Sequence, residues 1–469
     1  MKARYCVSLF AGLAVAMAWS LSSTMGIPAF ARKYHTSCAT CHYAYPKLNY
    51  FGRAFLNNGY RYPAGADEAV TKEEPIKLGA EGYKKMFPRA LWPSDIPGTI
   101  PLSIRVIQRA NRFESDAGGV STFEFPHEVE FLAGGTLGGA FSFFGETEIE
   151  NEDNDNELGT SFRLQYDPKP WLHIRAGMVS PHPIPEHLRL TAAHYNAYST
   201  RNTPESLTLS AVNPNDPMGP MLSIEARTDQ DRWRFRDDQS GVQVWGALNG
   251  RHEHGGLTWA LGVVNGQGRS DSNGRKDIYA RASWKFGGYG ELGGGEAPST
   301  TAFWRDDSLT VGAFYYDGAS LNLYEGSSLA LDPTSLTGIG EASVSSSIEN
   351  TFDLVGGHFD WFFKDLNIFG VYVRQTDDNP MGTGEGIDTD AWFAEANYVF
   401  EPWLIGIVRY GETDLDFDVS PDPETQQFLV PGVALMLRAN VKLTLEGQFR
   451  LDDPGDGKDR FVASLDFSF

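Results

Sequence analysis

FVASLDFSF, residues 461–469, alternates between apolar and polar side chains along its whole length. One face carries Ala463, Leu465, Phe467 and Phe469, and the other carries Ser464, Asp466 and Ser468. Side chains of a strand point alternately to its two faces, so a period of two predicts a β-strand with one apolar and one polar face.

The same alternation recurs along the chain from about residue 100 onward. It is clearest over residues 441–451 and 277–286, where apolar side chains alternate with polar ones. About 16 such segments follow one another, joined by tight links such as Asp167–Pro170 and Ala439–Asn440 or by longer acidic links such as Glu150–Glu157. Short turns that alternate with longer loops are typical of an antiparallel transmembrane barrel, and an even strand number places both its ends on the periplasmic side.

Alternation alone does not separate a membrane barrel from a soluble sandwich, because both have one apolar and one polar face. After the first 26 residues no apolar stretch is long enough for a spanning helix, so a membrane role requires a closed barrel. Phe400 and Trp403 suit an aromatic girdle at a membrane interface. The strand ending at Phe469 resembles the last strand of outer-membrane proteins. We therefore predict an all-β fold, a transmembrane barrel of about 16 antiparallel strands in the Gram-negative outer membrane.

Residues 1–26 have the features of a secretory signal peptide. Lys2 and Arg4 precede an apolar run from Val7 to Leu21, and small residues follow it. Cys6 would leave with this segment, so two cysteines remain in the exported chain. The 61 acidic side chains outnumber the 39 basic ones, and the net charge of -22 argues against nucleic-acid binding.

The two remaining cysteines lie in Cys38-Ala39-Thr40-Cys41-His42, the attachment motif of a c-type haem. Two thiols one short turn apart can form thioethers with the two vinyl groups along one porphyrin edge. We therefore predict that Cys38 and Cys41 attach one haem c and that His42 is its proximal iron ligand. A redox-active CxxC pair and half of a zinc site are the alternatives. Neither suits a motif with no surrounding βαβ pattern and no second CxxC.

Aromatic and basic residues surround the motif. The aromatic ones suit the face of a porphyrin or a small core: Tyr34, Tyr43, Tyr45, Tyr50, Phe51, Phe55, Tyr60 and Tyr62. Candidate partners for haem propionates are Arg32, Lys47, Arg53 and Arg61. The sixth iron ligand stays open among Met86, His35, His182, His187 and His194. The choice matters because a Met opposite the proximal His raises the reduction potential relative to a second His.

The predicted organisation has three parts: a signal peptide over 1–26, a monohaem c-type cytochrome module and linker over 27–98, and a barrel over 99–469. So small a module buries too little surface to cover both faces of a haem by itself. We expect it to plug or abut the barrel lumen, on the periplasmic side or inside, since a 16-stranded barrel leaves a wide lumen. Residues 180–235 do not alternate consistently and are a candidate constriction loop in that lumen.

Four N-terminal segments together carry a resemblance to a known family: Ile27–Arg32, Cys38–His42, Pro46–Leu48 and Phe51–Phe55. They resemble the fused monohaem cytochrome-porins of iron-oxidising bacteria, whereas the barrel matches only in length and strand pattern. The resemblance implies an iron(II):cytochrome c oxidoreductase of the outer membrane. Its haem would accept an electron from extracellular Fe(II) and pass it to a periplasmic c-type cytochrome.

Two other functions remain open on the sequence. The barrel could export electrons to an external acceptor, or it could be a solute porin gated by its haem module. The acidic run Glu146–Glu157 offers hard oxygen ligands suited to iron ions, although acidic loops are also ordinary on outer-membrane proteins.

Overall fold

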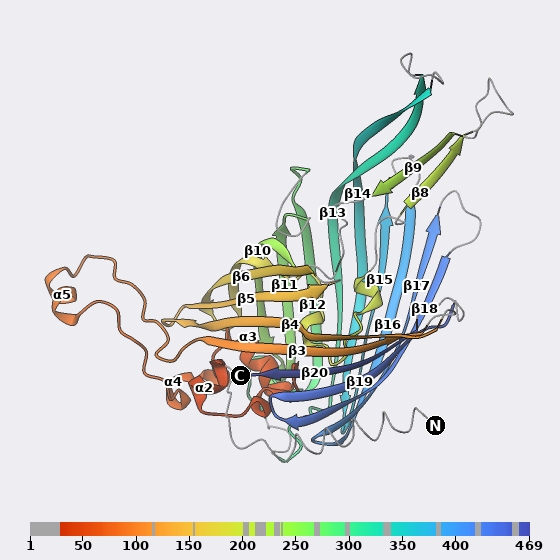
Figure 1. The fold of residues 1–469 in the computed structure, drawn as a ribbon. Helices are drawn as coiled ribbons and strands as arrows, with labels where there is room; N and C mark the ends of the chain where they lie inside the picture. The colour runs from red at the N-terminus through yellow and green to blue at the C-terminus, as the bar shows by residue number, and fades with distance from the viewer. Residues whose placement is uncertain are drawn as a thin grey trace.

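The computed structural model describes residues 29–114, 118–152, 155–199, 206–211, 222–228, 235, 238–266, 273–295, 301–331, 339–380, 386–417, 424–452 and 459–469. The predicted signal peptide lies outside the described residues. One long antiparallel sheet dominates the described chain, and the short helices that precede it lie at one of its ends (Figure 1).

Sixteen strands form the wall of a closed barrel, which confirms the predicted fold. They are β3 (Leu102–Phe113), β4 (Val120–Leu137), β5 (Phe141–Glu152), β6 (Asp155–Lys169), β7 (Leu172–Val179), β10 (Gln239–Asn249), β11 (His254–Val264), β12 (Asp277–Tyr289), β13 (Ser308–Leu331), β14 (Ile339–Phe363), β15 (Leu366–Asp377), β16 (Ile387–Glu401), β17 (Leu404–Phe417), β18 (Glu424–Arg438), β19 (Val441–Arg450) and β20 (Arg460–Ser468). Neighbours in this order pair antiparallel, and two seams close the ring: β20 pairs with β3, and β7 pairs with β10. Closure leaves the wall no free edge.

The two faces of the wall are inverted relative to a soluble protein. On β12, Trp284 and Phe286 are 43% and 55% exposed, whereas Lys285 between them is 3% exposed and pairs with Asp306 at 2.7 Å. On β19, Leu445 is open to the outside while its neighbour Glu446 is buried. On these strands the apolar face points outward and the polar face points into the lumen, as in a membrane barrel and not a soluble sandwich. The inner face of β15 and β16 differs locally, since buried apolar side chains such as Phe369 and Phe393 cluster there with Tyr195.

Exposed aromatic side chains gather at the end of the barrel where the strand connections are short. Trp361 and Phe363 precede the turn between β14 and β15, Phe400 and Trp403 flank the turn between β16 and β17, and Trp171 lies in the turn before β7. Rings at this level form the interfacial girdle of a barrel. No helix among the described residues is long and apolar enough to cross a membrane.

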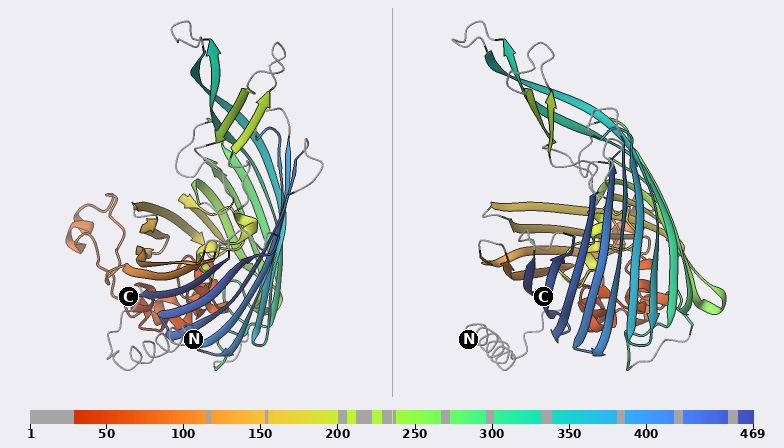
Figure 2. Two further views of the ribbon diagram at one scale, coloured as in Figure 1. Left: turned by 45° about the vertical axis from the view of Figure 1, so that its right-hand side comes forward. Right: turned by 90° about the vertical axis from the view of Figure 1, so that its right-hand side faces the viewer.

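Residues 29–66, which we call the plug, occupy the lumen at this short-turn end. The plug comprises α2 (Ala29–Tyr34), η1 (Cys38–Thr40), the hairpin of β1 (His42–Ala44) and β2 (Lys47–Leu48), α3 (Tyr50–Asn57) and η2 (Pro63–Gly65). It touches the wall on all sides: the Ala29 amide donates to Ser103 on β3, Tyr43 donates to Asn367 on β15, and Tyr45 lies 3.1 Å from Ser468 on β20. Figure 2 shows the plug, in red, within the curve of the strands.

The linker between the plug and the barrel runs outside the lumen. It contains α4 (Asp67–Val70) and α5 (Glu81–Met86), and α5 projects away from the wall (Figure 1). The first wall strand then begins at Leu102. The predicted boundary at residue 99 stays a prediction.

Ion pairs anchor the plug to inward-facing groups of the wall. Arg53 lies 2.5 Å from Asp360 on β14, and Arg61 lies 2.8 Å from Asp167 on β6. Lys47 lies 3.9 Å from Glu395 on β16 and 3.5 Å from the ring of Phe369.

The arginine Arg32 donates to the carbonyl oxygens of Ile100 and Leu102. All four basic residues considered as propionate partners thus engage groups of the linker and barrel wall in this structure.

Residues 180–199, which we call the lumen segment, fold into the barrel above the plug, as the missing alternation predicted. The segment contains η3 (Glu186–Leu188) and η4 (Asn196–Tyr198). Tyr195 stacks on Phe393 of β16 with ring centroids 4.5 Å apart, and Asn196 donates to backbone carbonyls of Trp392 and Glu412. Much of the remainder, residues 200–235, lies outside the described residues.

Two features at the opposite end concern the predicted loops. The strands β13 and β14 continue far beyond their neighbours, and the hairpin of β8 (Ser206–Ala211) and β9 (Leu222–Thr228) pairs with that extension at Tyr324 (Figure 2). The acidic run Glu146–Glu157 is not a long loop. Its described residues belong to β5 and β6, which pair with each other up to Glu152 and Asp155. Glu146, Glu148 and Glu150 recur every second residue, so they share one face of β5.

Candidate haem-binding site

A cavity of about 240 Å³ lies between the plug, the wall and the lumen segment. This is roughly twenty times the ~10–15 Å³ that one water needs. Cys38, Cys41 and His42 all line this space, which we call the cysteine cavity. Its aromatic lining comprises Phe30, Tyr34, Tyr45, Phe51, Phe55, Tyr60 and Tyr62 from the plug and Phe144 from β5. The structure thus brings together the three predicted site residues and most of the predicted rings in one chamber.

The cysteines occupy a tight turn with defined caps. Ser37 precedes η1 and accepts a hydrogen bond from the Ala39 amide, and the Cys41 amide donates to the Cys38 carbonyl at 3.1 Å. This 3-10 turn presents both side chains toward one cavity. Both cysteines are free thiols. A turn of this kind supplies the spacing that two thioethers on one porphyrin edge require.

The ring of His42 is held by the hairpin that follows the turn. Its Nδ1 donates to the carbonyl oxygen of Pro46 at 2.6 Å, which leaves Nε2 as the nitrogen with a free lone pair. Histidines that bind metals commonly fix their second nitrogen in this way, through a backbone carbonyl. Burial lowers the pKa of His42 to about 4, so the imidazole is neutral near pH 7, as metal binding requires.

Asn49 joins the turn to the next helix. Its side-chain oxygen accepts from the Gly52 amide and so caps the N-terminus of α3, while its Nδ2 donates to the carbonyls of Ala39 and Thr40. The Asn49 side chain is 1% exposed. Sequence reasoning did not single it out, although an Asn immediately before an apolar run is a helix-cap signal.

Gly52 allows α3 to lie directly on the cysteine turn. A Cβ at this position would lie 2.1 Å from the carbonyl oxygen of Cys41, far inside contact distance. The close approach places the aromatic side chains of α3 against the cavity. Only a residue without a side chain fits here.

Two observations concern the alternatives to haem, which are a redox-active pair of cysteines and a zinc site. Burial raises the pKa of Cys41 to about 12, whereas a redox-active thiol needs its pKa lowered. Among the described residues, no group of three or more His, Cys, Asp or Glu side chains is arranged to hold a metal ion. The described structure therefore offers no further ligands that would complete a zinc site with the two cysteines. The lining combines many rings with two thiols, a neutral imidazole and the charged side chains of Arg105, Glu130, Glu146 and Arg163. Rings for the faces of a porphyrin and arginines for its propionates suit a haem.

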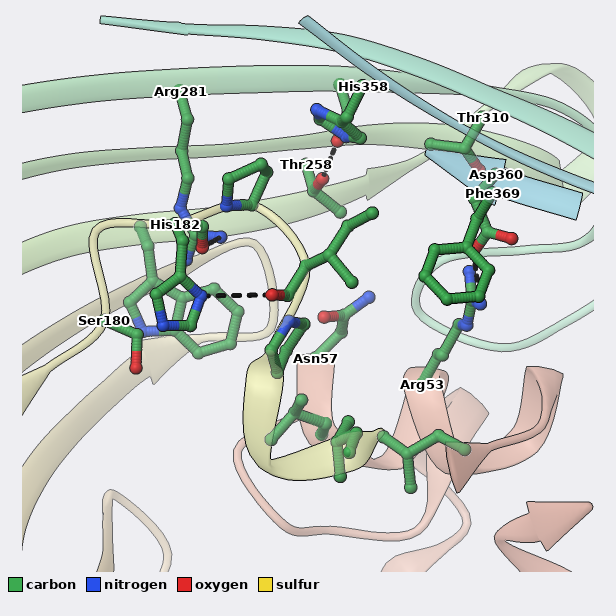
Figure 3. A pocket seen from close by; sticks show the side chains of 18 of the residues that line it. Arg53, Asn57, Ser180, His182, Thr258, Arg281, Thr310, His358, Asp360 and Phe369 are labelled. Carbon is green, nitrogen blue, oxygen red and sulfur yellow. Dashed lines mark hydrogen bonds and ion pairs between the residues drawn. The ribbon is translucent and has the colours of Figure 1, made fainter. Parts of the chain in front are cut away.

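A second cavity of about 270 Å³ lies beside the first and farther along the lumen. We call it the arginine cavity because Arg163, Arg175 and Arg281 of the wall line it. Figure 3 shows Arg53 and Asn57 of the plug facing His182 of the lumen segment across this space, with Arg281 above. The Arg281 guanidinium donates to the His182 carbonyl at 3.0 Å. Among the residues that line this cavity, Lys47, Arg53 and the three wall arginines outnumber the acidic Glu291 and Asp360, in contrast to the acidic chain as a whole.

The fold defines a class, a porin-like outer-membrane barrel of 16 strands with a plugged lumen. No protein-family description matches the sequence, and no curated protein matches it. Solved structures of similar architecture include the loop L8 deletion mutant of OmpT, an outer-membrane protein of Vibrio cholerae, at TM-score 0.45 and 11% identity over 79% of this chain and 99% of that one.

Two further solved structures have the same general similarity. One is OmpF of Salmonella typhi in complex with daunomycin, at TM-score 0.42 and 12% identity over 78% of this chain and 97% of that one. The other is the outer-membrane channel DcaP of Acinetobacter baumannii, at TM-score 0.42 and 13% identity over 78% and 96%. At these levels the likeness carries no functional argument, and the strand pairings of this chain define its fold.

Proposed function

We propose that this chain is an outer-membrane electron-transfer protein that carries one haem c in the periplasmic end of its barrel. Cys38 and Cys41 would hold the haem through thioethers, and His42 would ligate its iron through Nε2. This proposal rests on one observation. The three residues line the cysteine cavity, which is rich in aromatic side chains and lies between the plug and the barrel wall. The haem would supply one-electron redox chemistry.

The chain's own residues bind the cofactor and keep water away from it. Phe30 stacks on Tyr60 at 5.1 Å, and Tyr60 stacks on Phe144 of the wall at 6.2 Å, so rings of plug and barrel form one continuous apolar lining. The position at the short-turn end favours a periplasmic c-type cytochrome as the electron acceptor. Following the resemblance of the N-terminal segments, we propose extracellular Fe(II) as the donor.

A haem-gated porin for anionic solutes is the second candidate, and the arginine cavity favours it. Arg163, Arg175 and Arg281 place positive charge where a solute would pass, which attracts anions and repels hydrated Fe(II). Under the first proposal, the same charge requires that iron deliver its electron from outside this cavity or enter as an anionic complex.

A spectroelectrochemical titration of the purified full-length protein, followed by mixing with Fe(II), tests the leading proposal. We expect stoichiometric haem, a reduction potential above that of the local Fe(III)/Fe(II) couple, and rapid haem reduction. A potential far below that couple would favour electron export or sensing, and a barrel purified without haem would refute the electron-transfer function.

Gly52→Ala provides a separate test of the site. Alanine usually stabilises a helix relative to glycine by about 1 kcal/mol, but here its methyl group would collide with the Cys41 carbonyl. We expect several-fold less covalently bound haem per barrel, measured by pyridine haemochrome absorption. Gly82→Ala in α5 is the matched control, because no heavy atom lies within 4 Å of its added Cβ. Equal haem content in the two variants would contradict the packing described for α3.

A further inference from the structure

The lumen segment brings a second imidazole to the cysteine cavity. His187, in η3, lines the same space as His42 but comes from the opposite side, since η3 belongs to the segment above the plug. Of the described residues that line this cavity, His42 and His187 alone carry an imidazole, and none is a methionine. We propose that His187 is the second protein ligand that the haem iron would take, in addition to His42. This inference rests on the proposed function.

Two of the five candidates from the sequence lie away from the cavity. Met86 is 68% exposed on α5, which projects outside the barrel. His35 is exposed at the end of α2 and is not part of the lining. Neither side chain is part of the cavity lining in this structure.

The other two histidines of the lumen segment are engaged elsewhere. His182 stacks on Tyr198 with ring centroids 5.0 Å apart and lines the arginine cavity instead. His194 uses its Nδ1 in a contact of 2.8 Å with the Glu186 carboxylate. His187 is the one candidate of the five whose ring lines the chamber that holds the cysteines.

The ring of His187 is available for ligation. Among the described residues no hydrogen bond of its ring is found, and its side chain is exposed to the internal space that the cysteine cavity occupies. A neutral imidazole with a free lone pair is the form that binds iron.

Contacts within the lumen segment and contacts with the wall hold the chain around His187. The preceding carboxylate, Glu186, accepts hydrogen bonds from the Tyr195 amide and from His194. Farther along, the Ala192 and Ala193 amides donate to the Glu446 carboxylate of β19 at 2.7 and 2.9 Å. A ligand on a segment held in this way keeps its position, as a rigid metal site requires.

Arg409 of β17 also holds the lumen segment, through hydrogen bonds from its guanidinium. Its guanidinium donates to the Ala193 and His194 carbonyls at 3.1 and 2.7 Å, and its Nε donates to Glu395. Glu395 also pairs with Lys47 of the plug. One wall carboxylate thereby links the element carrying His42 to the element carrying His187.

The test is the ligation state of the ferric haem in the full-length protein, read by absorption and electron paramagnetic resonance. We expect a low-spin six-coordinate spectrum in the wild type, a high-spin spectrum in His187→Ala, and return of the low-spin spectrum when imidazole is added. His35→Ala is the control, because it removes another candidate imidazole that is exposed and outside the cavity lining, and it should stay low-spin. His187→Met should remain low-spin, gain sulfur–iron charge-transfer absorption and have a raised reduction potential.

The possible results separate the two proposals. A wild-type barrel without covalent haem, by pyridine haemochrome assay, would refute the proposed function itself. Covalent haem with a low-spin spectrum that persists in His187→Ala, or a five-coordinate wild type, would overturn the assignment of His187 alone. If His187→Ala fails to assemble, the spectrum of His187→Met decides, because low-spin haem without the sulfur band would also overturn it.

Discussion

In His42→Ala the barrel is expected to assemble while the low-spin haem spectrum and electron transfer are lost completely. The wall is held by the strand pairings, and the plug is held by Arg53, Lys47 and Arg61, none of which depends on His42. Removal of the imidazole takes away the proximal ligand and the hydrogen bond to Pro46. Folded barrel is measured by heat-modifiable migration on gels, and haem by absorption of the same samples.

A buried histidine of the wall supplies the control for this experiment. His127 on β4 is 5% exposed and lies between Glu124 and Glu150, remote from the cysteine lining. His127→Ala should therefore keep the full haem spectrum. Normal haem absorption in His42→Ala would contradict its assignment as the proximal ligand.

The second large effect is expected in ionic conductance. The wild-type protein in a planar bilayer should pass little current, because the plug and the lumen segment both occupy the lumen. In the double variant Lys47→Ala/Arg53→Ala, Glu395 and Asp360 lose their plug partners. Removal of one partner from a buried pair typically costs about 3–5 kcal/mol, because the remaining charge stays dehydrated.

Asp360 is then left without its cation, whereas Glu395 keeps Arg409 of the wall. With these two plug anchors removed, the plug is held less firmly and the variant should show large and frequent openings. Arg374→Ala is the matched control, since it breaks an ion pair with Asp388 in which both side chains are exposed. The control should conduct as the wild type does. A freely conducting wild type would refute the closed lumen, and an unchanged double variant would show that other contacts hold the plug.

The barrel could be predicted because its rules are local. Alternation along Asp277–Tyr289 gave the strand and its two faces from sequence neighbours alone, and the turn at Ala439–Asn440 gave a boundary. The local pattern could not decide which face of the strand lies against the lumen and which lies against the membrane. That answer came from the whole ring, in which Lys285 finds Asp306 inside while Trp284 lies outside.

The sequence could predict the three motif residues of the site but not the residues that surround them. Cys38, Cys41 and His42 are adjacent in sequence, and the spacing alone carries their chemistry. The partners of Arg53 and Lys47 lie more than 300 residues away, so no local rule could assign those cations to Asp360 and Glu395 rather than to a cofactor. His187 is likewise far from the motif in sequence, so the pattern alone could not place it, rather than the other candidate ligands, at the cavity.

The enclosed position of the cysteines sets an order of events in the maturation of the protein. Cys38 and Cys41 face a chamber whose far wall is made of strands that follow them in the chain, including β4, β5 and β6. Once those strands have joined the ring, a maturation enzyme can no longer reach the thiols. If the chain binds haem as proposed, the haem would have to be attached while the exported chain is still open, and the plug would carry it until the membrane-insertion machinery closes the barrel around it.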